Sequence, residues 1–225
     1  IPIKRGNKKA RAVFSRDEIK ILLALPDENY ETGLRDKVLL SFMYATGARA
    51  QEICDFTVDA LHINDKNASV TLTGKGTKAR QVGISLSLAR TVRKYIIHRH
   101  IEGYPEKHVF SSQTHEQMTV SCVEGIYKKY VAIAKEKHPN MFLKDSYPPH
   151  SMRHSTACHL LEAGVDIVTI KNILGHVSVQ TTQIYAEMSQ DSVDRKLKEW
   201  NDTWFSGNAE VKEVKKSIPG FLKRK

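Results

Sequence analysis

The sequence predicts a mostly helical α+β domain that carries one small antiparallel β-sheet. The first observation behind this fold class is a series of apolar residues at helical spacing, each bounded by capping residues, glycine or proline. The second is a pair of short runs rich in β-branched residues, joined by a glycine-flanked turn. The third is composition: 40% of the 225 residues are hydrophobic, and no segment approaches the ~18 uninterrupted apolar residues of a membrane span.

The chain begins with a basic segment, residues 1–11, that has five positive charges and no negative one. Such runs are usually solvated, and this one is predicted to be a linker or arm that lies along DNA phosphates. Because the first residue is Ile rather than Met, we expect the chain to be a fragment of a longer protein.

The first helix is predicted from Ser15 to about Leu25, where Pro26 stops it. Ser15 and Glu18 have the spacing of a capping box, and the flanking residues Phe14 and Ile19 have that of a hydrophobic staple. A second helix is predicted to end at Gly47, where a left-handed C-cap belongs, and a short polar turn or helix follows at 48–54. The apolar residues at helical spacing in the second helix are Leu34, Val38, Phe42, Tyr44 and Ala45.

Residues 68–73 and 79–85 are the two β-branched runs, and they predict a β-hairpin with a basic tip at 74–78. Asp166 is placed to cap a helix that Gly175 ends. Further helices are predicted around 88–96, 120–134, 151–162 and 167–174. These signals divide the chain into an arm at 1–11, one folded domain at 12–204 and a tail at 205–225 with an apolar stripe.

The charge balance favours a polyanionic partner, nucleic acid first and an acidic membrane surface second. The chain has 35 Lys and Arg residues against 25 Asp and Glu, a net charge of +10. Its three cysteines, Cys54, Cys122 and Cys158, are widely spaced and form no C-x-x-C pair. This pattern argues against a disulfide framework or a Cys-rich zinc site and favours a reducing cytoplasm.

Cleavage of a phosphodiester needs a nucleophile, cations for the growing negative charge, and an acid for the departing oxygen. Many nucleases supply the cations as metals held by clustered carboxylates, but the acidic residues here are scattered. His150 and His154 have a zinc-ligand spacing, yet no acidic residue lies between them. We therefore expect no metal and no cofactor, with Arg, Lys and His supplying the positive charge.

Five short motifs occur in a fixed order along the chain. Each motif alone is common by chance, but the occurrence of all five in this order strongly indicates a shared protein family. The motifs are Thr46-Gly47-Ala48-Arg49-Ala50-Gln51-Glu52, Gly74-Lys75-Gly76, His150-Ser151-Met152-Arg153-His154, Leu174-Gly175-His176 and Tyr185. With these motifs, residues 11–200 resemble the catalytic domain of the tyrosine recombinases, the phage integrase family.

The resemblance implies a role for each motif residue. Arg49 and Arg153 would hold the scissile phosphate, because a planar guanidinium matches two phosphate oxygens and keeps its charge. Lys75 would protonate the 5′-oxygen leaving group, and Lys78 in the same turn is a close competitor. Taken alone, Arg49 could simply cap a helix end, and Lys75 could be a solvated turn residue.

Tyr185 would be the nucleophile. A phenol with its reference pKa of about 10 is almost wholly protonated near neutral pH, so nearby cations would be needed to favour the phenolate. His150 and His176 would donate hydrogen bonds to the phosphate, with His150 also a candidate acceptor for the tyrosine proton. Glu52 would hold an active-site residue in place. A tyrosine on an amphipathic helix is otherwise most often a packing residue.

The implied function is site-specific DNA recombination through a 3′-phosphotyrosyl intermediate, with integration or excision of a mobile element favoured and chromosome dimer resolution left open. The implied partner is double-stranded DNA in a bacterial or phage-infected cytoplasm, with no membrane. The protein would be a homotetramer on paired sites and a monomer without DNA. The tail would pack on its own domain or dock as a helix on a neighbouring subunit. Two alternatives remain: relaxation of DNA like a type IB topoisomerase, and a non-catalytic DNA-binding regulator.

Overall fold

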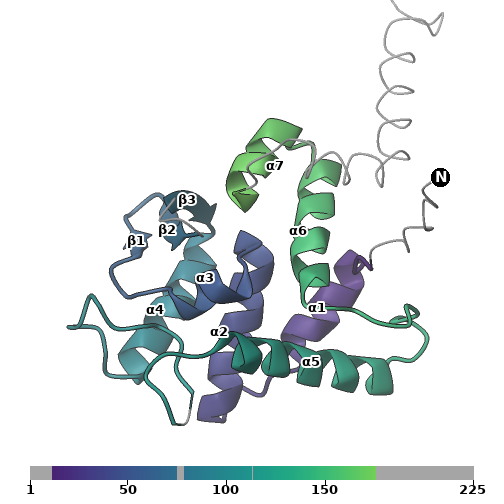
Figure 1. Ribbon diagram of the computed structural model, residues 1–225, viewed down its shortest axis with the longest axis horizontal. Coiled ribbons are helices and arrows are strands. Elements are labelled where there is room, and N and C mark those ends of the chain that lie inside the picture. Colours follow the sequence, from purple (N-terminus) through teal and green to yellow (C-terminus); the bar gives the residue numbers. More distant parts are fainter. Residues whose placement is uncertain (1–11, 75–78, 113, 176–225) are drawn as a thin grey trace, which may run out of the picture. The chain divides into compact units, whose positions relative to one another are not determined.

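The structure is a computed structural model that describes residues 12–74, 79–112 and 114–175. Within these ranges it has helices and one three-stranded antiparallel sheet, which confirms the predicted fold class (Figure 1). In chain order the elements are α1 (Arg16–Ala24), α2 (Glu31–Thr46), α3 (Ala50–Cys54), β1 (Leu61–Ile63), β2 (Ala68–Thr73), β3 (Ala79–Ile84), α4 (Leu86–His98), α5 (Val120–Lys137), α6 (His150–Glu162) and α7 (Ile167–Leu174). The predictions for the arm at 1–11 and the tail at 205–225 lie outside the described residues.

Helix α1 begins with the predicted capping box. The Ser15 hydroxyl accepts a hydrogen bond from the Glu18 backbone N–H at 3.1 Å, and the Glu18 Oε2 accepts from the Ser15 N–H at 2.5 Å. Phe14 and Ile19 are both buried beside it, as the staple requires. The second oxygen of Glu18, Oε1, accepts a hydrogen bond from the Tyr147 hydroxyl at 2.9 Å. This hydrogen bond therefore links the start of α1 to the loop that precedes α6.

Helix α2 runs through the middle of the described fold. Val38, Leu39, Leu40 and Phe42 on this helix are all fully buried. Figure 1 shows α2 and α3 between the sheet with α4 on one side and α1 with α6 on the other. The helix ends where predicted, at Gly47, whose φ of 58° is left-handed and whose N–H donates to the Met43 carbonyl. This turn leads directly into α3.

The sheet has the order β1-β2-β3, and β2 with β3 forms the predicted hairpin. Thr73 pairs with Ala79, so residues 74–78 connect the two strands. The inward face of β3 carries Arg80, Val82 and Ile84, while the residues between them are exposed. Strand β1 was not predicted; it pairs in antiparallel fashion with the first half of β2. An arginine therefore occupies a position on the inward face of a strand.

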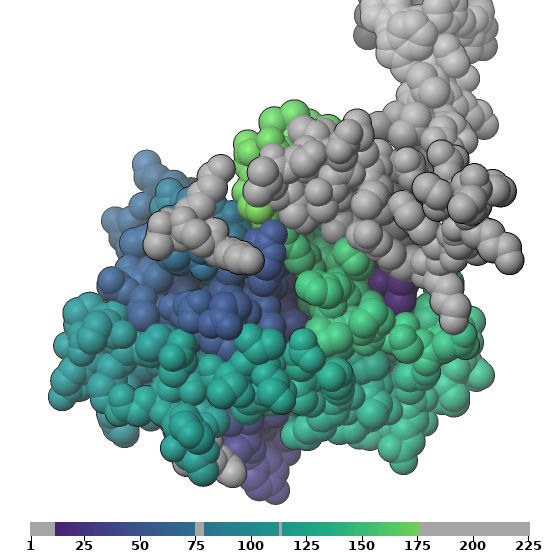
Figure 2. All heavy atoms as spheres, in the orientation of Figure 1, coloured from purple at the N-terminus to yellow at the C-terminus, as the bar shows by residue number. Residues whose placement is uncertain are grey.

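Helices α6 and α7 close the described part of the chain. Helix α6 begins at His150, one residue earlier than predicted, and α7 has the predicted bounds with Asp166 as its N-cap and Gly175 as its C-cap. A small apolar cluster joins the two helices, made of Ala157, Cys158, Ile170 and Leu174. Figure 2 shows the blue surface of α2, α3 and the sheet meeting the green surface of α6 and α7. No helix in the described ranges is long and apolar enough to cross a membrane.

Candidate functional site

Three arginines from distant parts of the sequence converge on the C-terminal end of α7. The last carbonyls of a helix lack partners within the helix and carry partial negative charge, so cations are favoured there. Each arginine binds a different one of three successive backbone carbonyls. Arg80 Nε donates to the Ile173 carbonyl at 2.7 Å, Arg153 Nη2 to the Leu174 carbonyl at 2.5 Å, and Arg49 Nη2 to the Gly175 carbonyl at 3.3 Å.

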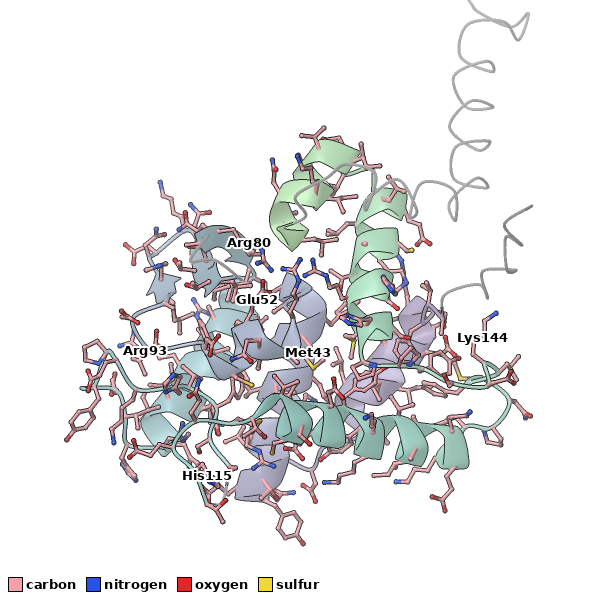
Figure 3. All side chains as sticks on the ribbon, in the orientation of Figure 1. Met43, Glu52, Arg80, Arg93, His115 and Lys144 are labelled. Carbon is pink, nitrogen blue, oxygen red and sulfur yellow. The ribbon has the colours of Figure 1, made fainter. Side chains whose placement is uncertain are left out.

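Glu52 on α3 links two of these arginines. Arg80 donates to both of its carboxylate oxygens, from Nη1 to Oε1 at 2.6 Å and from Nη2 to Oε2 at 2.8 Å. Arg49 donates from Nη1 to Oε1 and from its backbone N–H to Oε2, both at 2.8 Å. Burial raises the pKa of Glu52, but the hydrogen bonds from Arg80 and Arg49 outweigh this and hold the pKa below its ordinary value. Figure 3 shows Arg80 and Glu52 next to each other near the end of α7.

The three arginines differ in how far they are open to solvent. Arg153, on α6, is buried with 5% of its surface exposed, and its Nη1 donates to the Gly47 carbonyl at 2.5 Å. The Arg80 side chain is 11% exposed, whereas the Arg49 side chain is 40% exposed. Arg49 is therefore the most accessible of the three cations for a ligand that approaches from solvent.

Two glycines allow the end of α7 to approach the turn between α2 and α3. Gly47 and Gly175 have φ values of 58° and 65°, in the left-handed region that disfavours residues with a Cβ. A Cβ on Gly47 would lie 2.6 Å from Cδ2 of Leu174, and a Cβ on Gly175 would lie 3.0 Å from Cδ and Nη1 of Arg80. The close packing that brings the arginines to this helix end therefore depends on glycine at both positions.

The structure brings Arg49, Glu52 and Arg153 together, as the resemblance implies. His150 lies exposed in the first turn of α6, one turn before Arg153, and its ring centroid is 6.3 Å from that of His154. Within the described ranges there is no cluster of three His, Cys, Asp or Glu side chains that could hold a metal ion. The remaining predicted residues, Lys75, Lys78, His176 and Tyr185, lie outside the described residues.

Arg80 was not among the predicted site residues. The signal for it lies in the alternation of β3, in which Arg80 shares the inward face with Val82 and Ile84. A charged side chain on the buried face of a strand is rare and needs a partner of opposite charge. The partner of opposite charge is Glu52, which was already a candidate site residue.

The charges of the site favour an anion. Three guanidinium groups and one carboxylate, those of Arg49, Arg80, Arg153 and Glu52, leave two net positive charges among these four side chains. Guanidinium groups donate parallel hydrogen bonds that fit the oxygens of a phosphate. The cluster therefore has the charge and the donors to hold a phosphodiester at Arg49.

The sequence is similar to those of known proteins over most of its length. The model of the phage integrase family matches residues 12–191. A tyrosine recombinase XerD of Lacticaseibacillus casei is 36% identical over 188 residues, which cover 81% of this chain and 61% of that protein. A tyrosine recombinase XerC of Chlamydia caviae is 31% identical over 185 residues, covering 81% of this chain and 56% of that protein. The chain thus spans about six-tenths of the length of these relatives.

Solved structures share the fold at lower identity. The XerH site-specific recombinase in a post-cleavage complex with a palindromic difH substrate has a TM-score of 0.72 at 19% identity, covering 88% of this chain and 56% of that one. The Tn1549 transposon integrase in complex with transposon right-end DNA has a TM-score of 0.68 at 19% identity, covering 86% of this chain and 67% of that one. These two likenesses show the fold.

Proposed function

The chain belongs to the phage integrase family, and on that premise we propose that it cuts and rejoins double-stranded DNA at specific sites through a covalent phosphotyrosyl intermediate. The observation that carries the proposal is the meeting of Arg49 and Arg153 at the end of α7, on neighbouring backbone carbonyls. Both arginines stand in the motifs that resemble the phosphate-binding motifs of this family. We propose residues 12–204 as the catalytic domain.

In this mechanism the phenol oxygen of Tyr185 attacks the scissile phosphorus, and the bond from phosphorus to the 5′-oxygen breaks. The phenol proton passes to His150, and the departing 5′-oxygen takes a proton from Lys75, or from Lys78 in the same turn. Arg49 and Arg153 offset the negative charge that grows on the non-bridging oxygens, and His150 and His176 donate hydrogen bonds to them. Glu52 keeps Arg49 in place through its two contacts.

A 5′-hydroxyl from a partner duplex then attacks the phosphorus of the phosphotyrosyl bond and gives its proton to the lysine that protonated the first leaving group. The bond from phosphorus to the Tyr185 oxygen breaks, and that oxygen takes its proton back from His150. One phosphoester bond replaces another in each step, so this exchange needs no nucleotide hydrolysis and no cofactor. Exchange between two duplexes requires two sites to be held together, and we propose a homotetramer on paired DNA sites. The curated relatives are bacterial proteins, which supports action on DNA in a bacterial cytoplasm.

The test is covalent capture on DNA. The protein is incubated in EDTA with a library of randomised, nicked duplexes, and DNA that stays bound after denaturation in detergent is sequenced to define the site. Wild type is expected to form an adduct at Tyr185, mapped by mass spectrometry. Tyr185→Phe should bind the captured site without forming an adduct, while Tyr104→Phe, at an exposed tyrosine, should react like wild type. An adduct in Tyr185→Phe would refute the assignment.

The two alternative functions have separate outcomes. A topoisomerase would relax a supercoiled plasmid that lacks the captured site, and a regulator would bind the site with no adduct in any variant. The role in integration or excision of a mobile element stays a prediction. The genomic position of the captured site tests it: the site should lie at the ends of a mobile element, whereas a single chromosomal copy would contradict this role.

A further inference from the structure

The carboxylate of Glu52 is shared unequally between two arginines. Arg80 donates one hydrogen bond to each oxygen, at 2.6 and 2.8 Å, in the parallel geometry that suits a guanidinium and a carboxylate. The Arg49 side chain makes a single contact with the same carboxylate, through Nη1. Arg80 is also held from its other side by the Ile173 carbonyl, which accepts from Nε. Arg80 is therefore the principal partner of Glu52.

This sharing has a consequence for Arg49. Glu52 is 2% exposed, and a buried carboxylate that loses one of its partners is strongly destabilised. Without Arg80, the Arg49 guanidinium is the nearby cation already in contact with Glu52, and a paired geometry on both oxygens would satisfy the carboxylate. Arg49 would then be neutralised and drawn away from any phosphate.

We propose that Arg80 is a positioning residue, which satisfies Glu52 and thereby keeps the Arg49 guanidinium open to a phosphate. This proposal rests on the proposed function in one respect: Arg49 is taken to be a phosphate ligand. The different exposures of the two side chains support it, since Arg80 is 11% exposed and Arg49 is 40% exposed. Arg80 would act through Glu52 and Arg49 without touching the DNA.

The experiment titrates inorganic phosphate into the protein and follows the Nε–H signals of the arginines by NMR. The Arg49 signal is identified by its loss in Arg49→Lys. Arg80→Gln is expected to weaken phosphate binding at Arg49 by about tenfold or more, the equivalent of ~1.4 kcal/mol of binding free energy. Arg80→Lys keeps the charge but supplies a single contact, so its affinity should lie between those of Arg80→Gln and wild type.

The double variant Glu52→Gln/Arg80→Gln separates this role from a purely structural one. With the carboxylate gone, residue 52 can no longer neutralise Arg49, while an amide oxygen at this position can still accept from the Arg49 backbone N–H and keep it in place. Phosphate affinity should therefore return to within about threefold of wild type. A purely structural role predicts that the double variant binds phosphate as weakly as Arg80→Gln, or more weakly. If Arg80→Gln does not fold, phosphate affinity is compared between Arg80→Lys and the double variant. The double variant has no unpaired buried charge at position 52.

Arg35 provides a matched control. Its Nε and Nη2 both donate to Oδ1 of the buried Asp36 carboxylate, at 3.0 and 2.8 Å, and its side chain is 15% exposed, so it is likewise a largely buried arginine paired with a buried acid. Arg35→Gln should lower the melting temperature but leave phosphate affinity at Arg49 unchanged. Equal affinity in wild type and Arg80→Gln, or an equal loss in Arg35→Gln, would overturn the proposal.

The phosphate titration needs no DNA cleavage, so its result tests the role of Arg80 independently of the proposed recombinase function. Phosphate affinities that follow the expected order in a protein that forms no DNA adduct would support the role of Arg80 and refute the recombinase mechanism. A DNA adduct in wild type combined with unchanged phosphate affinity in Arg80→Gln would refute the role of Arg80 alone.

Discussion

A single added methyl group at Gly47 is expected to destabilise the protein substantially. Gly47 has a φ of 58°, and an L-residue held in this left-handed conformation costs roughly 1–2 kcal/mol. The new Cβ would also lie 2.6 Å from Cδ2 of Leu174, which is fully buried and has no solvent to move into. Overpacking of this kind typically costs about 1–3 kcal/mol, so Gly47→Ala should lower the free energy of unfolding by about 2–5 kcal/mol.

The assay is equilibrium unfolding in urea, with Gly125→Ala as the matched control. Gly125 lies within α5 and is exposed, and a methyl group added there would meet no described atom within 4 Å, so alanine should stabilise the protein by about 0.5–1 kcal/mol. The same substitution is therefore expected to have opposite signs at the two glycines. A Gly47→Ala protein whose unfolding free energy is within about 0.5 kcal/mol of wild type would refute the reasoning, because that is the range of a neutral surface change.

Two further predictions concern buried acids. Glu52 has a pKa held below its ordinary value of 4.5, so its ionised form stabilises the fold fully above that pH and progressively less as the pH falls through the lowered value. The unfolding free energies of wild type and Glu52→Gln, measured in steps downward from pH 6, should therefore converge in acid, and a constant difference would contradict this. Tyr147→Phe removes a hydroxyl that donates to the buried Glu18 at 2.9 Å, and should cost about 1–3 kcal/mol in urea unfolding. Tyr30→Phe, at an exposed tyrosine, is its control, and equal effects would count against the hydrogen bond.

Helix ends were well predicted because their signals are local. The side chains that cap α1 and α7, Ser15 and Asp166, bind backbone groups within three residues of themselves. Gly47 and Gly175 likewise mark helix ends through their own backbone conformation. None of these features depends on contacts between distant parts of the chain, so a short stretch of sequence is enough to predict where each helix begins or ends.

Features set by distant contacts were missed. Strand β1 is three residues long and partly buried, and its extended form depends on pairing with β2. The role of Arg80 depends on Glu52, 28 positions earlier, and on the end of α7, 93 positions later. The grouping of Arg49 with Arg153 came from the family resemblance, since no local pattern places residues so far apart at one helix end. The roles of all the candidate site residues stay predictions: Arg49, Glu52, Lys75, His150, Arg153, His176 and Tyr185.

The convergence of three arginines on the end of α7 also has a bearing on biosynthesis. Ribosomes release a chain from its N-terminus, and the carbonyls of residues 173–175 emerge after Arg49, Arg80 and Arg153 have left the exit tunnel. Until α7 docks, each of these cations lacks the carbonyl acceptor that α7 supplies, although Glu52 and the Gly47 carbonyl are already available to them. The nascent polypeptide would thus carry the proposed phosphate-binding groups only partly assembled, and the cluster would be completed when α7, the last helix of the described residues, docks. A truncated translation product that stops short of α7 would lack the three carbonyl acceptors and therefore the assembled cluster.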